Sequence, residues 1–298
     1  MTSGWRSTLA AVLGLAVAGA ASGPEGRAAA QERRAPAPTP RAQAPRDVTG
    51  YWVSVVTEDW LWRMVTPPRG DVTSVPLNEA GRRVANLWDP AKDIGDDACK
   101  AFGAAAIMRV PGRIRITWED DTTIKVDTDA GLQTRRFLFG RESSSGWRVN
   151  ARGELEWFAV GRDLPPPAGQ RGWQGYSVAR WEVAADPAAV RAAVFFPGGL
   201  GTGPDGAGMV AQGRFGSLHV LTTRMKPGYL RRNGVPYSGD ARVTEDYDFR
   251  TEDDGTEWVT VTTVVEDPTY LASPFVTSTD FKKEPDGSKW RPKPCAAY

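Results

Sequence analysis

Residues Arg242–Glu266 read RVTEDYDFRTEDDGTEWVTVTTVVE, and two segments of this stretch alternate between apolar and polar residues. The first segment is Arg242–Phe249, the second is Trp258–Glu266, and Asp and Gly residues lie between them. A period of two is typical of a β-strand that buries one face, and Val, Thr and aromatic residues favour strands. The stretch therefore predicts two strands separated by a turn.

The same pattern recurs along most of the chain and predicts an all-β fold. Because the strands are short and no helices alternate with them, we expect a predominantly antiparallel barrel, lipocalin-like in general plan, or a sandwich. We favour a barrel with an interior cavity, since many aromatic side chains must be placed. The further candidate strands are Tyr51–Val56, Leu61–Thr66, Ala105–Val110, Arg113–Glu119, Thr123–Asp127, Gln133–Phe139, Leu155–Val160, Tyr176–Val183, Ser217–Thr223 and Phe275–Lys282.

One short helix is predicted near residues 78–88. Apolar residues between Leu77 and Trp88 recur at the spacing of a single helix face. Asn78 is a suitable N-cap, and Pro90 is a suitable stop signal.

The first 46 residues are predicted to lie outside the folded domain. Residues 1–30 contain a basic start, an apolar run at Leu9–Ala21 and small residues at Ala28–Ala30, which together are typical of a secretory signal peptide. The apolar run is shorter than the ~20 residues that span a bilayer. Gln31–Arg46 is rich in Pro and charge, so we expect a flexible linker there. Residues 47–298 are then a single β domain of a periplasmic or secreted protein.

The composition excludes several classes of function. The chain has 37 Lys and Arg against 36 Asp and Glu, which lacks the basic excess of a nucleic-acid-binding protein. A single histidine and two cysteines cannot supply a usual Zn site, and a catalytic triad would depend on His219 alone. We therefore predict no metal, no cofactor and no nucleic-acid partner.

The two cysteines are predicted to form a structural disulfide. An exported protein meets an oxidising compartment, and Cys99 and Cys295 give an even count. Two unpaired thiols are the alternative.

Glu245 and Arg135 are the main candidates for a site. Each lies on the apolar face of an alternating strand, where an unpaired charge is costly. Glu245 shares its face with Tyr247, and Arg135 shares its face with Phe137. We expect the two charges to pair inside the barrel, either as a structural ion pair or as a ligand-binding and catalytic site.

Other polar and aromatic residues extend the candidate site. Glu119 is a second possible acid or base, and His219 could transfer protons near neutral pH. The remaining candidates are predicted to line the ligand cavity: Trp118, Trp181, Tyr176, Arg180 and Tyr247.

Several short motifs resemble a family of exported bacterial proteins of uncharacterised function, found in acidobacteria and proteobacteria. The family has a GxSxxxWE strand, a G-x-P-x-S turn before a Glu-containing strand and a late EDP turn. This chain departs from it after the WE pair, where VAA replaces a Gly-Asp-Thr-Leu turn. The resemblance implies export and a shared β-scaffold without an activity. The matching positions are Gly175, Ser177, Trp181, Glu182, Gly234, Pro236, Ser238, Glu245, Glu266, Asp267 and Pro268.

Three functions remain open from the sequence. The first is binding of a small apolar or aromatic ligand in a Trp-lined cavity, with Arg135 and Glu245 anchoring a polar group. The second is a cofactor-independent lyase, isomerase or hydratase that uses Glu as acid or base and Arg to stabilise negative charge. The third is an interaction protein of the cell envelope. The sequence leaves the oligomeric state open and predicts no membrane span.

Overall fold

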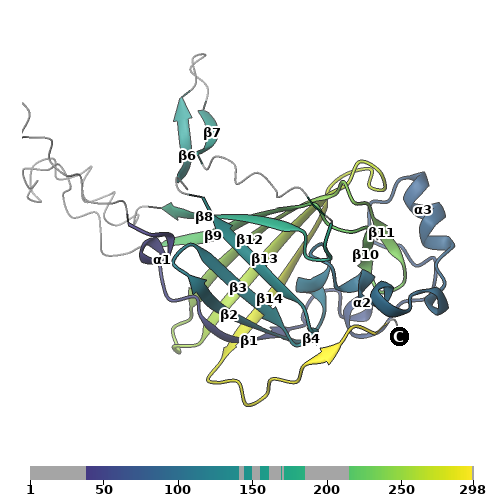
Figure 1. The fold of residues 1–298 in the computed structure, drawn as a ribbon, viewed down its shortest axis with the longest axis horizontal. Helices are drawn as coiled ribbons and strands as arrows, with labels where there is room; N and C mark the ends of the chain where they lie inside the picture. Colours follow the sequence, from purple (N-terminus) through teal and green to yellow (C-terminus); the bar gives the residue numbers. More distant parts are fainter. Residues whose placement is uncertain are drawn as a thin grey trace, which may run out of the picture. The chain divides into compact units, whose positions relative to one another are not determined.

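Nine strands form a closed barrel (Figure 1). The computed structural model describes residues 38–140, 144–149, 155–160, 169, 171–184 and 215–296, so the predicted signal peptide at 1–30 lies outside the described residues. All neighbouring strands pair antiparallel except β5 and β8, which confirms the predicted all-β barrel. In barrel order the strands are β1 (Gly50–Val55), β14 (Phe275–Glu284), β13 (Glu257–Glu266), β12 (Arg242–Thr251), β9 (Phe215–Thr223), β8 (Tyr176–Ala184), β5 (Thr134–Phe139), β3 (Thr123–Thr128) and β2 (Arg113–Asp120).

The β12–β13 hairpin has the alternation that its sequence predicts. Glu245 pairs with Thr263 and Tyr247 pairs with Val261, and all four side chains are buried inside the barrel. The intervening residues of β12 point outward, with Asp246 half-buried and Asp248 exposed. Because each strand buries every second residue, the period of two gave the correct face for each side chain.

The parallel pairing of β5 with β8 was not predicted. Between these strands the chain forms a separate antiparallel hairpin of β6 (Ser144–Val149) and β7 (Leu155–Val160). A parallel neighbour requires a long crossover connection, and the segment containing this hairpin supplies it. The prediction of a strand at Leu155–Val160 is confirmed, whereas its partner β6 was missed.

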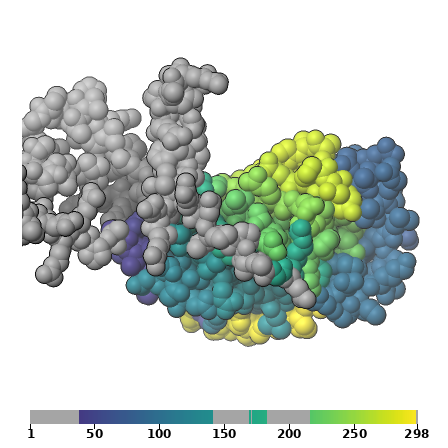
Figure 2. Space-filling model, turned by 45° about the horizontal axis from the view of Figure 1, so that its top comes forward, coloured from purple at the N-terminus to yellow at the C-terminus, as the bar shows by residue number. Residues whose placement is uncertain are grey.

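A layer of short elements, which we call the cap, covers one end of the barrel (Figure 1; the blue residues at one end in Figure 2). A second hydrophobic core fills it, in which Leu230, Tyr237 and Met225 are almost fully buried. The cap consists of α2 (Trp60–Met64), α3 (Glu79–Asn86), η2 (Pro90–Lys92), η3 (Gly95–Phe102), η4 (Ile107–Arg109), β10 (Gly228–Arg231) and β11 (Val235–Tyr237). Beside it, β4 (Ala130–Gly131) pairs in parallel with β15 (Lys293–Pro294).

Two predicted strands are wrong because they belong to the cap. Leu61–Thr66 overlaps helix α2, and Ala105–Val110 contains the 3-10 helix η4. Residues 101–109 are buried without interruption, so their apolar pattern reflects neighbours on all sides and does not report a strand face. The predicted helix is confirmed as α3, and the Asn78 side chain accepts a hydrogen bond from the Gly81 amide at 3.0 Å.

The end of the predicted linker packs against the barrel. Residues 40–43 form the short helix α1 (Pro40–Gln43), where we expected an extended chain. The Trp181 indole donates a hydrogen bond to the Pro40 carbonyl at 2.8 Å, and the Arg41 amide donates to the Asp121 carbonyl. Groups of the barrel thus form hydrogen bonds with backbone atoms of this segment, which the composition predicts to be exposed to solvent. The domain boundaries themselves stay a prediction.

An ion pair lies at the centre of the barrel. Arg135 donates to both carboxylate oxygens of Glu245, at 2.8 and 2.6 Å, and also to the Thr222 hydroxyl at 3.2 Å. Both charged side chains have no exposed area. Burial alone would lower the pKa of Arg135, but the adjacent Glu245 carboxylate raises it. The fold therefore holds two opposite charges that solvent cannot reach.

Removing one member of this pair should destabilise the fold strongly. Glu245→Leu leaves the Arg135 charge buried and unpaired, so we expect the free energy of unfolding to fall by about 3–5 kcal/mol in urea denaturation. The double variant R135M/E245L removes both charges and should recover most of this loss.

The matched control is Glu119→Gln, since Glu119 forms an exposed ion pair with Arg136. We expect this change to cost less than about 1 kcal/mol. An E245L cost as small as that of the control would show that the central pair does not constrain the fold.

Candidate functional site

The centre of the barrel has no space for a ligand beside Glu245. The side chains of Glu245, Tyr247 and Phe137 have no accessible area, so no water-sized space touches them. Both carboxylate oxygens of Glu245 already bind Arg135. The predicted pairing of Arg135 with Glu245 is therefore present, and its geometry is that of a structural ion pair. A catalytic or anchoring role for the two residues stays an untested prediction.

The predicted aromatic residues lie at different places in the barrel wall. Trp118 and Trp181 point inward near α1, where their rings lie 6.4 Å apart and both contact Phe139. Tyr247 lies next to Arg135, and burial together with the Glu245 charge raises its pKa well above the usual value. Tyr176 is half-buried and belongs to the outer face. The structure does not bring these four residues together.

The other predicted catalytic residues also lie on the outer face. Glu119 is exposed and accepts hydrogen bonds from Arg136, whose guanidinium lowers the pKa of that carboxyl. Arg180 donates to Glu182 at 2.7 Å. His219 lies beside Asp246 on the same outer face. None of these side chains reaches Glu245 through the barrel wall, so the candidate residues from the sequence do not form one site.

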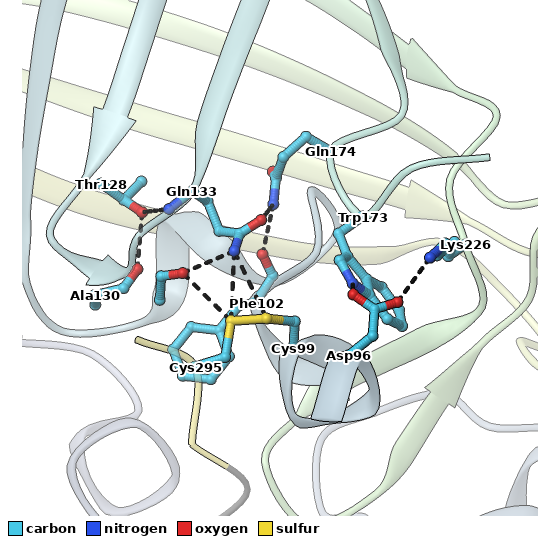
Figure 3. The surroundings of a disulfide bond; sticks show 11 residues. Asp96, Cys99, Phe102, Thr128, Ala130, Gln133, Trp173, Gln174, Lys226 and Cys295 are labelled. Carbon is cyan, nitrogen blue, oxygen red and sulfur yellow. Dashed lines mark hydrogen bonds and ion pairs between the residues drawn. A yellow bond between two sulfur atoms is a disulfide. The ribbon is translucent and has the colours of Figure 1, made fainter. Parts of the chain in front are cut away.

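The disulfide between Cys99 and Cys295 is present, as predicted (Figure 3). It attaches the segment after β14 to helix η3 of the cap. The Gln133 side-chain amide lies against both sulfurs and donates to the Gly131 carbonyl at 2.7 Å (Figure 3). Gly131 has φ +79° and packs directly on the Phe102 ring. Only glycine fits there, because a Cβ would lie 2.5 Å from a ring carbon. The disulfide and Gln133 thus hold Phe102, Gly131 and the terminal segment together.

Sequence reasoning missed a pocket in the cap that four arginines line, three of them buried and the fourth, Arg232, half-buried. Arg63 comes from α2, Arg109 from η4 and Arg231 from the end of β10, and each is at most 7% exposed. With Trp62 and Leu230 they surround a small cavity of about 20 Å³, enough for a single water-sized group. We call this cavity the arginine pocket.

Arg231 has no hydrogen-bond partner among the described residues. Its three guanidinium nitrogens are buried and make no hydrogen bond, although the group lies 5.0 Å from the centre of the Trp62 ring. Arg63 donates from Nε to the Arg109 carbonyl, but its Nη2 is buried without a partner. Buried polar groups are nearly always satisfied, and a buried charge even more so. Unsatisfied guanidinium donors therefore lie buried in the wall of the pocket.

The positive charge in the pocket is only partly compensated. Burial and the Arg109 charge together lower the pKa of both Arg63 and Arg231 to about 10. Asp59 forms an ion pair with Arg109 at 3.0 Å and acts on the other two arginines from a greater distance, as do Glu58 and Asp280 on Arg63 and Asp71 on Arg231. Guanidinium groups in proteins are normally charged at every accessible pH, so a lowered pKa marks a site where positive charge is unfavourable without an anion.

A wider groove adjoins the arginine pocket. It has a volume of about 390 Å³ and shares Arg63, Val110 and Arg232 with the pocket. Its wall is largely apolar and includes the segment that the disulfide holds. The other lining residues are Met64, Phe102, Pro111, Ala130, Gly131, Lys293, Pro294 and Ala296. The pocket and the groove together combine a cationic end with an apolar surface.

No protein-family model, curated protein or solved structure matches this chain. The resemblance to exported bacterial proteins therefore stays a prediction. Within the described part of the chain, no helix has both the length and the apolar character required to cross a membrane.

The sequence contains a feature that indicates the arginine pocket, although hydrophobic periodicity does not detect it. Arg63 lies within the apolar run WLWRM, and Arg231 lies within GYLRRNGVPY. An arginine inside an apolar run is a candidate for burial, by the same reasoning that singled out Arg135. Because Leu61–Thr66 was assigned to a strand, nothing placed Arg63 near Arg231.

Loss of the disulfide should weaken both the fold and the groove. The bridge spans 196 residues, and the chain-entropy account gives a loss of about 5 kcal/mol for C99S/C295S. We expect this drop in guanidinium denaturation, with no further effect of dithiothreitol on the variant. Wild-type protein treated with dithiothreitol is the matched comparison, and an unchanged unfolding midpoint in both would contradict a stabilising role.

Proposed function

We propose that the protein binds a small molecule with a carboxylate head and an apolar or aromatic body. The carboxylate would enter the arginine pocket, and the body would lie along the adjoining groove. One observation carries the proposal: the buried guanidinium of Arg231 has no hydrogen-bond partner among the described residues. A bound anion would satisfy these donors and compensate the charge that burial penalises.

The charge of the pocket favours an anion over a neutral polar group. Four arginines and no carboxylate line the pocket, and the carboxylates of Asp59, Glu58, Asp71 and Asp280 act on the buried arginines from outside it. Guanidinium donors match the two oxygens of a carboxylate, and a desolvated charge-assisted hydrogen bond is stronger than a neutral one. The Trp62 ring lies 5.0 Å from the Arg231 guanidinium, whose nitrogens are buried, so side chains would have to shift for a carboxylate to reach them.

The dimensions favour a carboxylate on an apolar body. The arginine pocket holds about 20 Å³, space for one water-sized group such as a carboxylate oxygen, and excludes a bulky polar group. The groove beyond it is lined mainly by apolar residues such as Met64, Phe102 and Pro111, with Arg232 and Lys293 among its few charged residues. A molecule with one carboxylate and a largely apolar body would therefore match both parts.

This proposal keeps ligand binding, as the sequence suggested, but moves the site from the barrel centre to the cap. Arg63, Arg109 and Arg231 take the anchoring role that we had assigned to Arg135. The Cys99–Cys295 disulfide and the predicted signal peptide support export to an oxidising compartment. A role for Glu245 as acid or base gains no support from its buried position.

Calorimetric titration can test the head group directly. We expect 4-phenylbutyrate to bind, and 4-phenylbutan-1-ol, which has the same carbon skeleton without the charge, to bind on the order of tenfold to a hundredfold more weakly. Arg231→Met should remove this preference, whereas the control Arg136→Met changes an exposed arginine of the outer face and should not.

Two results would contradict the proposal. One is equal binding of the acid and the alcohol by the wild-type protein. The other is unchanged binding of the acid by Arg231→Met. Tighter binding of inorganic phosphate than of phenylbutyrate would show that the pocket prefers a phosphate head group to a carboxylate.

Arg231→Met should also stabilise the protein when no ligand is present. The change removes a buried charge that no described residue pairs with and retains most of the apolar stem, so we expect a gain of about 1–2 kcal/mol after loss of the contact with Trp62. Urea denaturation measures the difference. A loss of stability would mean that Arg231 acts as a structural residue.

A further inference from the structure

A second cluster of chemically active side chains lies on the outer wall of the barrel, apart from the arginine pocket. It consists of Glu182 on β8, His219 on β9 and Asp246 on β12, and we call it the outer-wall cluster. His219 is directly opposite Asp246 in the β9–β12 pairing, and Glu182 follows two residues after the partner of His219 on β8. Three adjacent strands thus hold the three side chains on one face.

The three side chains converge on one point. Nδ1 of His219 lies 2.6 Å from Oδ1 of Asp246 and 3.6 Å from Oε1 of Glu182. One ligating atom from each residue lies within 4.8 Å of the others, and all three side chains are half-buried. The imidazole nitrogen therefore lies between two carboxylate oxygens.

These separations are close to those of a metal site. Bonds of about 2.0–2.2 Å to nitrogen and oxygen place neighbouring ligands of a tetrahedral site about 3.3–3.6 Å apart. The 3.6 Å between Nδ1 and Glu182 fits this range, whereas Nδ1 and Asp246, which are hydrogen-bonded at 2.6 Å, would have to move apart by about 1 Å. Rigid strands hold their backbones, which leaves only side-chain torsions to adjust.

The surroundings provide further oxygen atoms and access from solvent. A surface depression at this point is also lined by Ser217, Asp248 and Thr262. Asp248 brings a third carboxylate, and the two hydroxyl groups can bind metal-coordinated water. Arg180 donates to Glu182 at 2.7 Å and contributes one positive charge against three carboxylates. The depression keeps an excess of negative charge.

We propose that the outer-wall cluster binds one divalent first-row transition metal ion, with water completing its coordination. A mixed set of one imidazole and two carboxylates suits Zn²⁺ or Mn²⁺ better than Ca²⁺ or Mg²⁺, which prefer oxygen alone. A usual Zn site is built mainly from several His and Cys ligands, which this chain lacks. Here Glu182 and Asp246 supply the ligands that the single histidine cannot.

Titration of tag-free protein with ZnCl₂ tests the site without a variant. His219 is the single histidine of the chain, so the imidazole nitrogen resonances in an NMR spectrum report this residue alone. We expect them to shift with one equivalent of Zn²⁺, and calorimetry to give one site per chain. Unshifted resonances at excess Zn²⁺ would overturn the proposal.

Variants then assign the ligands. Asp246→Asn and Glu182→Gln should each weaken Zn²⁺ binding at least tenfold, and Arg180→Gln should strengthen it because a repelling charge is removed. Glu119→Gln is the matched control, since it removes an outer-face carboxylate that pairs with Arg136. Equal affinities for all these proteins would show that Zn²⁺ binds elsewhere.

The variant Arg231→Met tests whether the metal site is independent of the proposed ligand pocket. The variant should retain Zn²⁺ binding while it loses 4-phenylbutyrate binding. Thermal unfolding of each variant shows whether it is folded, and the resonance shift in the wild-type protein decides the question if a variant fails to fold.

Discussion

The buried ion pair between Arg135 and Glu245 constrains how the strands of the barrel can be arranged and how its core can pack. Its two charges are fully desolvated, and their bidentate geometry requires β5 and β12 to face each other across the barrel. Packed rings and aliphatic side chains surround the pair and leave no accessible area on it. The interior around the pair is therefore filled by side chains.

Unlike the barrel interior, where Arg135 and Glu245 pair with each other, the cap holds positive charge that is only partly compensated. Folding there brings four arginines together around one pocket and leaves the Arg231 guanidinium without hydrogen-bond partners among the described residues. Proteins tolerate such unfavourable local arrangements mainly where function requires them. The arginine pocket and the outer-wall cluster lie on different elements, so each can change without loss of the other.

The sequence predicted those features that depend on one strand or one residue type. Alternation located the barrel strands and placed Glu245 and Arg135 inward, and cysteine parity predicted the disulfide. It could not predict the parallel β5–β8 pair, because strand order depends on the connection between strands and not on their faces. It assigned Leu61–Thr66 and Ala105–Val110 to strands because the cap covers these segments on several sides. The two clusters were missed as groups, since their members lie far apart in sequence and meet only in the folded chain.

The position of β1 has a consequence for how the chain reaches this structure. β1 joins β2 on one side and β14 on the other, so Tyr51 pairs with both Arg115 and Glu284. The barrel cannot close until a strand made more than 200 residues later has arrived. Contacts of such long range slow folding, and the incomplete sheet exposes unpaired edges meanwhile. A chain synthesised from its N-terminus must therefore remain open until its last barrel strand is available.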